Sequence, residues 1–227
     1  MALTGQIGTV TVEARPGAAG ADRVLAQTRA PDADRPHPDG AAVFHRAYLA
    51  VAGEPAAPTA SALETRLAER YFAARETVRG GHRPPAAWRP LFQFRRHPGV
   101  RPLQFGLAGI NAHVGHDLPL AVVDACLALG CEPAAVEGEF ERVGDRLLAL
   151  EERIVEDLAP GPDLLHVTDP LAHLLGVWSL ERARDTAWSA ARVLWSLREL
   201  PDLAAEFSRR TDAGVGLVGR CLLTPWR

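Results

Sequence analysis

Hydrophobic residues recur at three- and four-residue steps along most of the chain after residue 40. This spacing puts apolar side chains on one face of a helix and predicts amphipathic helices that pack together. The pattern therefore predicts an all-α fold, a single helical-bundle domain of five or six helices. The expected helices cover residues 41–51, 61–79, 106–124, 136–158 and 168–200, the last as one helix or as two joined near Gly176.

The two ends of the chain depart from this pattern. Residues 6–13 alternate enough between apolar and polar side chains to predict one short strand. Residues 15–40 are rich in proline, glycine, alanine and aspartate, which is typical of irregular segments. Pro201 ends the last long helix, and residues 214–227 are apolar enough to dock as a short helix or strand. We expect a flexible or irregular N-terminal arm over residues 1–40 and one α-helical domain over residues 41–227.

The predicted helix over residues 106–124 is largely apolar but has one polar edge. Because an α-helix has 3.6 residues per turn, four polar residues fall along one side of it: His113, His116, Asp117 and Asp124. Buried polar groups are costly unless they are paired. Such a cluster marks either a hydrogen-bonded core network or a functional site.

Pro119 lies two residues after Asp117 in this predicted helix. A proline inside a helix removes the hydrogen bond to the carbonyl four residues earlier, here that of Gly115, and bends the chain. The freed carbonyl lies beside His116 and Asp117. A bend next to a polar cluster fits a binding cavity better than a plain core, so the pattern favours a site.

His113 and Asp117 are four residues apart, so on a helix they face the same way and can share a proton or a metal ion. In the first interpretation Asp117 orients an imidazole that acts as general acid or base, and His116 is a third catalytic candidate. The chain has no GxSxG motif and no cysteine with a conspicuous histidine partner, which disfavours covalent catalysis. The leading hypothesis is a small-molecule enzyme, with elimination or cyclisation in specialised metabolism as the reaction.

Substrate binding requires further residues around such a catalytic pair. The loop over residues 95–101 is basic and precedes the central helix, so its arginines are candidates to hold an anionic substrate group. Trp188 is a candidate to line the pocket. The predicted substrate-binding residues are Asn111, Trp188, Arg101 and Asp185.

Two other hypotheses use the same helix. A metal-dependent hydrolase would take His113 and Asp117 as its first metal ligands, although their spacing is not HExxH. Its further ligands would come from other helices, with these candidates: His45, His166, His173, Glu64 and Asp185. A non-enzymatic binding or assembly protein would use the polar residues as a buried lock, with Trp188 or Arg192 as partners. The sequence requires no cofactor, and a divalent metal is compatible with it.

Composition and charge limit which binding partners and which cellular compartment we expect for this protein. The net charge of −3 and the pI near 6.2 give no basic footprint, so nucleic acid is not an expected partner. No apolar run approaches the roughly 18–20 residues needed to span a bilayer, and the N-terminus lacks the pattern of a signal peptide. The three cysteines have no zinc-binding spacing. We expect a cytoplasmic protein with a small-molecule substrate and no membrane contact, and a homo-oligomer or a partner protein is compatible with the sequence.

The segment GINAHVGHDLP at residues 109–119 resembles the signature of a bacterial family classed as domain of unknown function 5995. Further segments similar to that family are RLAERYFA at 66–73, PPAAW at 84–88 and RDTAW at 184–188. The resemblance covers about residues 41–200 and implies an α-helical domain without a known activity. The matching positions that it singles out are Asn111, His113, Asp117 and Trp188.

Overall fold

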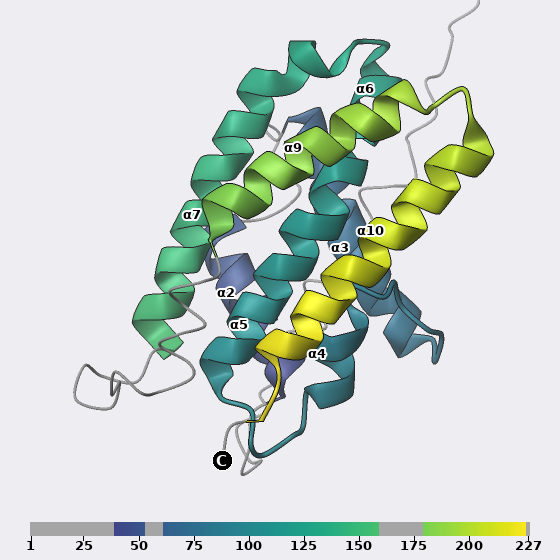
Figure 1. Ribbon diagram of the computed structural model, residues 1–227. Helices are drawn as coiled ribbons and strands as arrows, with labels where there is room; N and C mark the ends of the chain where they lie inside the picture. Colours follow the sequence, from purple (N-terminus) through teal and green to yellow (C-terminus); the bar gives the residue numbers. More distant parts are fainter. Residues whose placement is uncertain (1–38, 53–60, 159–178, 226–227) are drawn as a thin grey trace, which may run out of the picture. The chain divides into compact units, whose positions relative to one another are not determined.

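The computed structural model describes residues 39–52, 61–158 and 179–225, all within one compact unit that spans residues 32–227. This part of the chain is all-α and has no strand (Figure 1). It has seven helices, six of them seven residues or longer, when the continuous central run is counted once. The predicted all-α bundle of five or six helices is confirmed. The α-helical segments are α2 (Gly40–Ala52), α3 (Ala62–Arg79), α4 (Arg89–Phe94), α5 (Pro102–Ala112), α6 (Leu118–Leu129), α7 (Glu137–Leu158), α9 (Leu180–Ser196) and α10 (Pro201–Leu222).

The centre of the bundle is a helical run over residues 102–129, made of α5, the π-helical turn η1 (His113–Asp117) and α6 (Figure 1). α5 packs against α2, α7 and α10, while α6 packs against α3 and α9. Every residue from Leu103 to Ala112 is buried. Because other helices surround this run, its side chains supply much of the hydrophobic core.

This central run is also long and apolar enough to cross a membrane, judged by length and composition alone. It has 28 residues, and 56% of its 18-residue window of mean hydropathy 1.2 is buried inside the protein. A core helix covered by its neighbours meets the same criteria. The helix reaches this length and mean hydropathy although polar side chains at His113, His116 and Asp117 interrupt its apolar sequence, so an uninterrupted apolar run was too narrow a criterion for it.

Local sequence signals set the ends of several helices. Ser61 caps α3: its hydroxyl accepts the N–H of Glu64, and the Glu64 carboxylate accepts the N–H of Ser61. α6 ends at Gly130, whose φ of 63° lies in the left-handed region that favours glycine. Pro201 lies in the first turn of α10, where its missing N–H costs no helical hydrogen bond.

Two glycines allow neighbouring helices to approach α5 closely. A Cβ atom at Gly109 would lie 2.3 Å from the ring of Phe44 on α2, and one at Gly106 would lie 2.5 Å from Ile154 on α7. Both separations are well inside the ordinary carbon–carbon contact of about 3.5–4.0 Å. The aromatic side of α2 is thereby placed directly against the run that carries His113.

The C-terminal part of the chain differs from the sequence prediction. α9 ends before Pro201 as expected, but residues 201–222 form a 22-residue helix, α10, rather than a connection to a short terminal element. The buried residues of α10 are Gly216, Gly219 and Leu222. Two of these three are glycines, whereas the apolar side chains of Leu203, Leu217 and Val218 on the same helix are exposed. The predicted strand over residues 6–13, the arm up to residue 38 and the start of the predicted helix at 168 lie outside the described residues.

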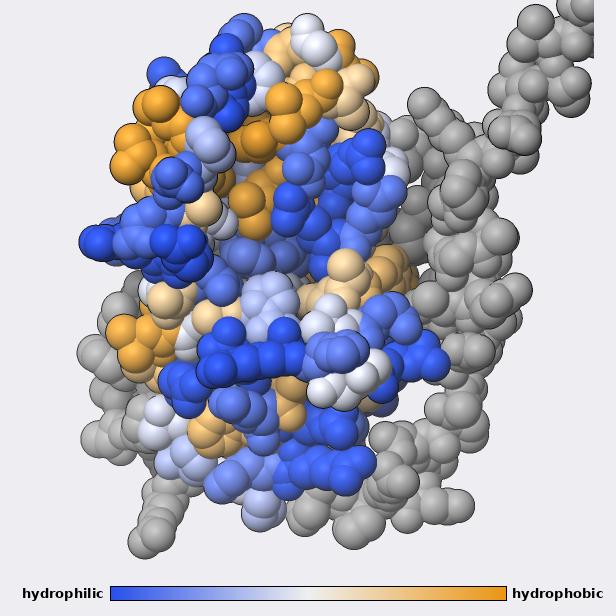
Figure 2. Space-filling view, turned by 90° about the vertical axis from the view of Figure 1, so that its right-hand side faces the viewer, coloured by the Kyte–Doolittle hydropathy of each residue, from blue (hydrophilic) through white to orange (hydrophobic). Residues whose placement is uncertain are grey.

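Some apolar side chains of these helices remain outside the core. Leu127 and Leu129 near the end of α6 are exposed, as are Leu200 and Leu203 around the start of α10. In the view of Figure 2, apolar surface gathers toward the upper end, while hydrophilic side chains dominate the middle and lower parts. Packing among the described helices thus leaves part of the apolar surface uncovered.

Candidate active site

The polar motif occupies the π-helical turn η1, in which the N–H of Leu118 bonds to the carbonyl of His113, five residues earlier. This wide turn ends just before Pro119. In an α-helix the Pro119 ring would clash with the carbonyl of Gly115, and a π turn makes room for the ring without ending the helix. The disruption predicted at Pro119 is therefore a π turn, a feature that is frequent at functional sites.

The π turn also changes which residues share a side of the helix. One inserted residue rotates all following positions by about 100°, so a single 3.6-residue period does not extend across it. Asp124, predicted to lie beside His113, instead accepts a hydrogen bond from Arg70 Nε on α3 at 2.9 Å. Asp124 belongs to the contact between α3 and α6 and not to the polar motif.

His113 and Asp117 form a buried pair, and Trp88 completes it. His113 Nδ1 lies 3.2 Å from Asp117 Oδ2, and the two side chains are 1% and 2% exposed. The indole Nε1–H of Trp88 donates to the same carboxylate, at 3.2 and 3.1 Å from its two oxygens. A buried carboxylate requires such donors. In the tautomer whose Nδ1 hydrogen is directed at Asp117, the lone pair of the imidazole is on Nε2.

Aromatic rings surround the His113 imidazole. Their centroids lie 5.3, 5.9, 6.3 and 6.5 Å from that of the imidazole, for Tyr48, Tyr71, Trp88 and Phe44 respectively. Burial and the nearby Asp117 carboxylate raise the pKa of Tyr48, so its hydroxyl stays protonated and able to donate a hydrogen bond. This aromatic cage is a weakly polar environment, in which the His113–Asp117 interaction is stronger than in water.

His116 connects the buried pair with the protein surface. Its Nε2 lies 3.9 Å from Asp117 Oδ1, and its Nδ1 lies 3.5 Å from Asp212 Oδ1 on α10. Side-chain exposure rises along the series, from 1% at His113 and 2% at Asp117 to 10% at His116 and 20% at Asp212. The four side chains form a row of titratable groups that leads from the core toward solvent.

Asp212 also holds the segment that carries Trp88. Its two carboxylate oxygens accept the N–H groups of Ala86 and Ala87, each at 2.8 Å. These bonds fix the turn just before α4 and so help to aim the Trp88 indole at Asp117. Sequence reasoning missed both residues, because each is distant in the chain from the motif. The one available signal was the PPAAW segment, whose last residue is Trp88.

A second buried polar cluster adjoins the aromatic cage. His45 Nδ1 lies 3.0 Å from the Tyr71 hydroxyl and 2.9 Å from Arg75 Nη1. Burial and the charges of Arg75 and Arg46 lower the pKa of His45 to about 3. His45 is therefore neutral at physiological pH. The sequence suggested His45 only as a candidate metal ligand. In the structure its side chain contacts Tyr71 and Arg75.

Asn111 links the central run to α10. Its Nδ2 donates to the carbonyl of Val215 at 3.0 Å, and the residue is 7% exposed. Gln104 makes a similar link, with its Nε2 at 2.8 and 2.9 Å from the carbonyls of Leu222 and Thr224. Asn111 thus lies next to the motif, while its amide N–H contributes to helix packing, and its role in substrate binding stays a prediction.

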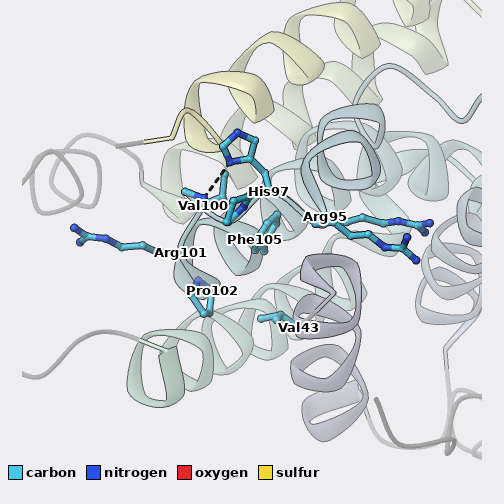
Figure 3. A pocket seen from close by; sticks show the side chains of 10 residues that line it. Val43, Arg95, His97, Val100, Arg101, Pro102 and Phe105 are labelled. Atoms are coloured by element: carbon cyan, nitrogen blue, oxygen red, sulfur yellow. Dashed lines mark hydrogen bonds between the residues drawn. The ribbon is translucent and has the colours of Figure 1, made fainter. Parts of the chain in front are cut away.

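Arg101 is not brought to the His113–Asp117 pair. It immediately precedes α5, and with the 11 residues of that helix between them it lies about 18 Å from His113 along the helix axis. It lines a cavity of about 340 Å³ together with Arg95, Arg96 and His97. Figure 3 shows the side chains of Arg95 and Arg101 extending to opposite sides of this cavity. The predicted anion-binding arginines therefore do not converge on the catalytic candidates.

Trp188 and Asp185 on α9 also lie apart from the pair. The Trp188 ring packs on Phe140 of α7, with centroids 4.7 Å apart, and it lines a separate cavity together with Arg192. Asp185 is exposed. The physical reason is that α9 turns small residues toward the core, including Ala187 and Ala191.

The predicted lock between the motif and Trp188 or Arg192 is accordingly corrected. The indole that donates to Asp117 belongs to Trp88, which is fully buried just before α4. Trp88 is the last residue of the PPAAW segment, and Trp188 is the last residue of the RDTAW segment. Both segments end in Ala-Trp and both are similar to the family. Only the tertiary fold distinguishes which of the two reaches the motif.

The donor atoms of the described residues do not assemble a metal centre. Nowhere in the described ranges are three or more His, Cys, Asp or Glu side chains grouped so that they could hold a metal ion. Of the further predicted ligands, Glu64 is engaged with Ser61 and with Arg146 at 3.0 Å. His166 and His173 lie outside the described residues. What this part of the chain provides at the motif is a His–Asp pair.

These features define a class of protein, namely an all-α bundle whose central helix carries a buried His–Asp pair on a π turn. Residues 21–225 match the family described as "Family of unknown function (DUF5995)", and the chain belongs to this family. The resemblance inferred from the GINAHVGHDLP segment is thereby confirmed. Neither the curated proteins nor the solved structures contain a match to the chain.

Proposed function

We propose that this protein is an enzyme that acts on a small molecule by acid–base chemistry at His113. The observation that carries the proposal is the position of the Asp117 carboxylate, which accepts hydrogen bonds from His113 Nδ1 and Trp88 Nε1 within the core. An imidazole held in this way has a fixed orientation and tautomer, as a general base requires.

The proton-transferring atom in this proposal is Nε2 of His113. It removes a proton from the substrate, and the Asp117 carboxylate stabilises the imidazolium that forms. His116 lies 3.9 Å from Asp117 and 3.5 Å from the more exposed Asp212. It is therefore placed to pass a proton between the buried pair and solvent after small side-chain movements.

The surroundings of His113 favour an apolar reacting group. The aromatic cage offers ring faces and edges that bury hydrocarbon well, whereas a charged group would lose its solvation there. Elimination or cyclisation, in which a base removes a proton from a carbon skeleton, fits this environment. Because His113 is 1% exposed, substrate reaches Nε2 only when cage side chains move apart. Turnover therefore includes an opening step.

The proposal is tested by incubating the purified protein with a bacterial metabolite extract and comparing the products by untargeted mass spectrometry. We expect the wild type to consume at least one compound and to form a product, with the same change in His82→Gln, which alters an exposed histidine. His113→Gln should abolish the change while circular dichroism shows a folded protein. An extract that the wild type leaves unchanged, or turnover that survives His113→Gln, contradicts the proposal.

A second function is favoured by the burial of the whole motif. Asn111, His113 and Asp117 are 7% exposed or less; His113 bonds to Asp117, Trp88 donates to Asp117, and Asn111 donates to α10. In this alternative the protein is a binding or assembly protein, and the motif locks the central run to its neighbours. It predicts that His113→Gln lowers the free energy of unfolding by about 1–3 kcal/mol and leaves partner binding intact in a pull-down assay.

A further inference from the structure

The cavity lined by Trp188 is distinct from the His113 site. It has a volume of about 400 Å³ and lies between α9 and the segment formed by η2 (Pro133–Val136) and the start of α7. The cavity is lined by two indole rings, two carboxylates and one guanidinium group, which belong to Trp188, Trp195, Glu132, Glu137 and Arg192. A cavity of this size accommodates a small organic molecule.

The two indole rings are held in place at the edge of this cavity. Trp188 and Trp195 are seven residues apart on α9, so they lie two turns apart on one face of the helix. Trp188 is supported by Phe140, 4.7 Å away between centroids. Trp195 donates its Nε1–H to the Glu132 carboxylate. Both tryptophans are half-buried, so each keeps part of a large aromatic surface open to a ligand.

A cation already lies against one of these rings. The guanidinium carbon of Arg198 is 4.6 Å from the centroid of the Trp195 ring. Tryptophan is the best aromatic partner for cations, because its ring face carries partial negative charge. The carboxylates of Glu132 and Glu137 add negative charge at the same cavity. Because Arg198 already occupies one face of Trp195 and repels a further cation there, the ring of Trp188 and the two carboxylates are the groups that suit this end of the cavity to an ammonium group.

The cavity is lined by a carboxylate and a guanidinium group that do not form an ion pair with each other. In the described part of the chain neither Glu137 nor Arg192 takes part in an ion pair within 4.0 Å, although both line the same cavity. The Arg192 guanidinium can form paired hydrogen bonds to a carboxylate. The cavity thus presents one group for an anion and several for a cation.

We propose that this cavity binds a small zwitterion, with a methylated ammonium group at Trp188 and Glu137 and a carboxylate at Arg192. A methylated ammonium is favoured over a bare one because its weaker hydration makes transfer to an aromatic surface less costly. This site is independent of the chemistry proposed at His113, so either can fail without the other.

The test uses three probes of similar shape, measured by isothermal titration calorimetry and tryptophan fluorescence. Glycine betaine carries both charges, choline lacks the carboxylate, and 3,3-dimethylbutanoate replaces the ammonium by neutral carbon. We expect glycine betaine to bind with a dissociation constant in the millimolar range or tighter. Choline should bind about fivefold more weakly, and 3,3-dimethylbutanoate more weakly again.

Charge variants at the cavity assign the two ends of the ligand. Arg192→Gln should reduce glycine betaine binding to the level of choline and leave choline unchanged. Glu137→Gln should weaken both probes by about threefold. The matched controls are Arg182→Gln on α9 and Glu156→Gln on α7, both exposed and outside the cavity lining, and they should change neither affinity.

Three results would overturn the proposal. The first is the absence of glycine betaine binding throughout the millimolar range. The second is equal binding of glycine betaine and 3,3-dimethylbutanoate, which would show that the positive charge is not recognised. The third is binding that neither Arg192→Gln nor Glu137→Gln changes, because the probe would then be bound elsewhere.

Discussion

The substitution Trp88→Phe tests how the buried carboxylate of Asp117 is stabilised. Phenylalanine retains an aromatic ring near Phe44 and Tyr71, whose centroids lie 5.7 and 5.1 Å from that of Trp88. It removes the Nε1–H that donates to Asp117 at 3.1–3.2 Å. A hydrogen bond to a charged group contributes about 1.5–3 kcal/mol, and the lost ring volume adds about 1 kcal/mol.

We therefore expect Trp88→Phe to lower the free energy of unfolding by about 3 kcal/mol, which for a chain of this length lowers the midpoint temperature by about 6–12 °C. Urea unfolding followed by circular dichroism gives the free energy directly. Trp195→Phe is the matched control. Its Nε1–H binds the exposed Glu132 carboxylate, so removing it should cost less than about 1 kcal/mol.

A double-mutant cycle with Asp117→Asn isolates the hydrogen bond from the effect of ring size. In the Asp117→Asn background the indole faces a neutral amide, so Trp88→Phe should cost about 1–2 kcal/mol less than in the wild type. Equal costs in the two backgrounds, within about 0.3 kcal/mol, would refute the claim that Trp88 stabilises a buried carboxylate charge.

Three further predictions concern the surroundings of His45, of Gly109 and of two cysteines. The pKa of His45 falls from 6.5 unfolded to about 3 folded, so unfolding takes up a proton below pH 6.5 and stability drops as the pH falls. Between about pH 7.5 and pH 5, urea unfolding should show the wild type losing about 2 kcal/mol more than His45→Gln; equal losses would contradict the assigned pKa. Gly109→Ala should destabilise by about 2–3 kcal/mol in thermal unfolding, whereas Gly138→Ala, where a Cβ makes only an ordinary contact, should stabilise by about 0.5–1 kcal/mol; similar shifts would count against the close packing at α5. Maleimide labelling with mass spectrometry should modify the exposed Cys221 but not Cys126, whose burial raises its pKa to about 12; rapid labelling of native Cys126 would argue against its burial.

Much of the helical architecture was predictable because its signals are local. Ser61 and Glu64 mark the start of α3, Gly130 follows the end of α6, and apolar spacing identifies α7. The first half of α10 was missed because Pro201 was interpreted only as the end of the preceding helix, whereas it lies in the first turn of the next one. At Gly216 a Cβ would lie 2.4 Å from the carbonyl oxygen of Ala86, so this close approach to the segment before α4 depends on a residue that adds nothing to the hydrophobic pattern.

The candidate site was predictable only where its members share one helix. His113 and Asp117 were paired correctly from their four-residue spacing. The partners Trp88 and Asp212 come from distant segments, and no spacing rule connects them with the motif. Asp124 was misplaced because the π turn before Pro119 rotates all later residues around the helix axis. The π turn relieves the clash between the Pro119 ring and the carbonyl four residues earlier, and a 3.6-residue period does not predict such a local change.

The central claim is that a small molecule can reach Nε2 of His113 in the folded protein. Diethyl pyrocarbonate, which reacts with neutral imidazole nitrogens, measures this directly when the modified histidines are mapped by mass spectrometry. The account predicts that native His113 reacts more slowly than the exposed His97 but faster than the protein unfolds globally on the same sample. Modification of His113 only at the rate of global unfolding would contradict it and would favour a purely structural role for the pair.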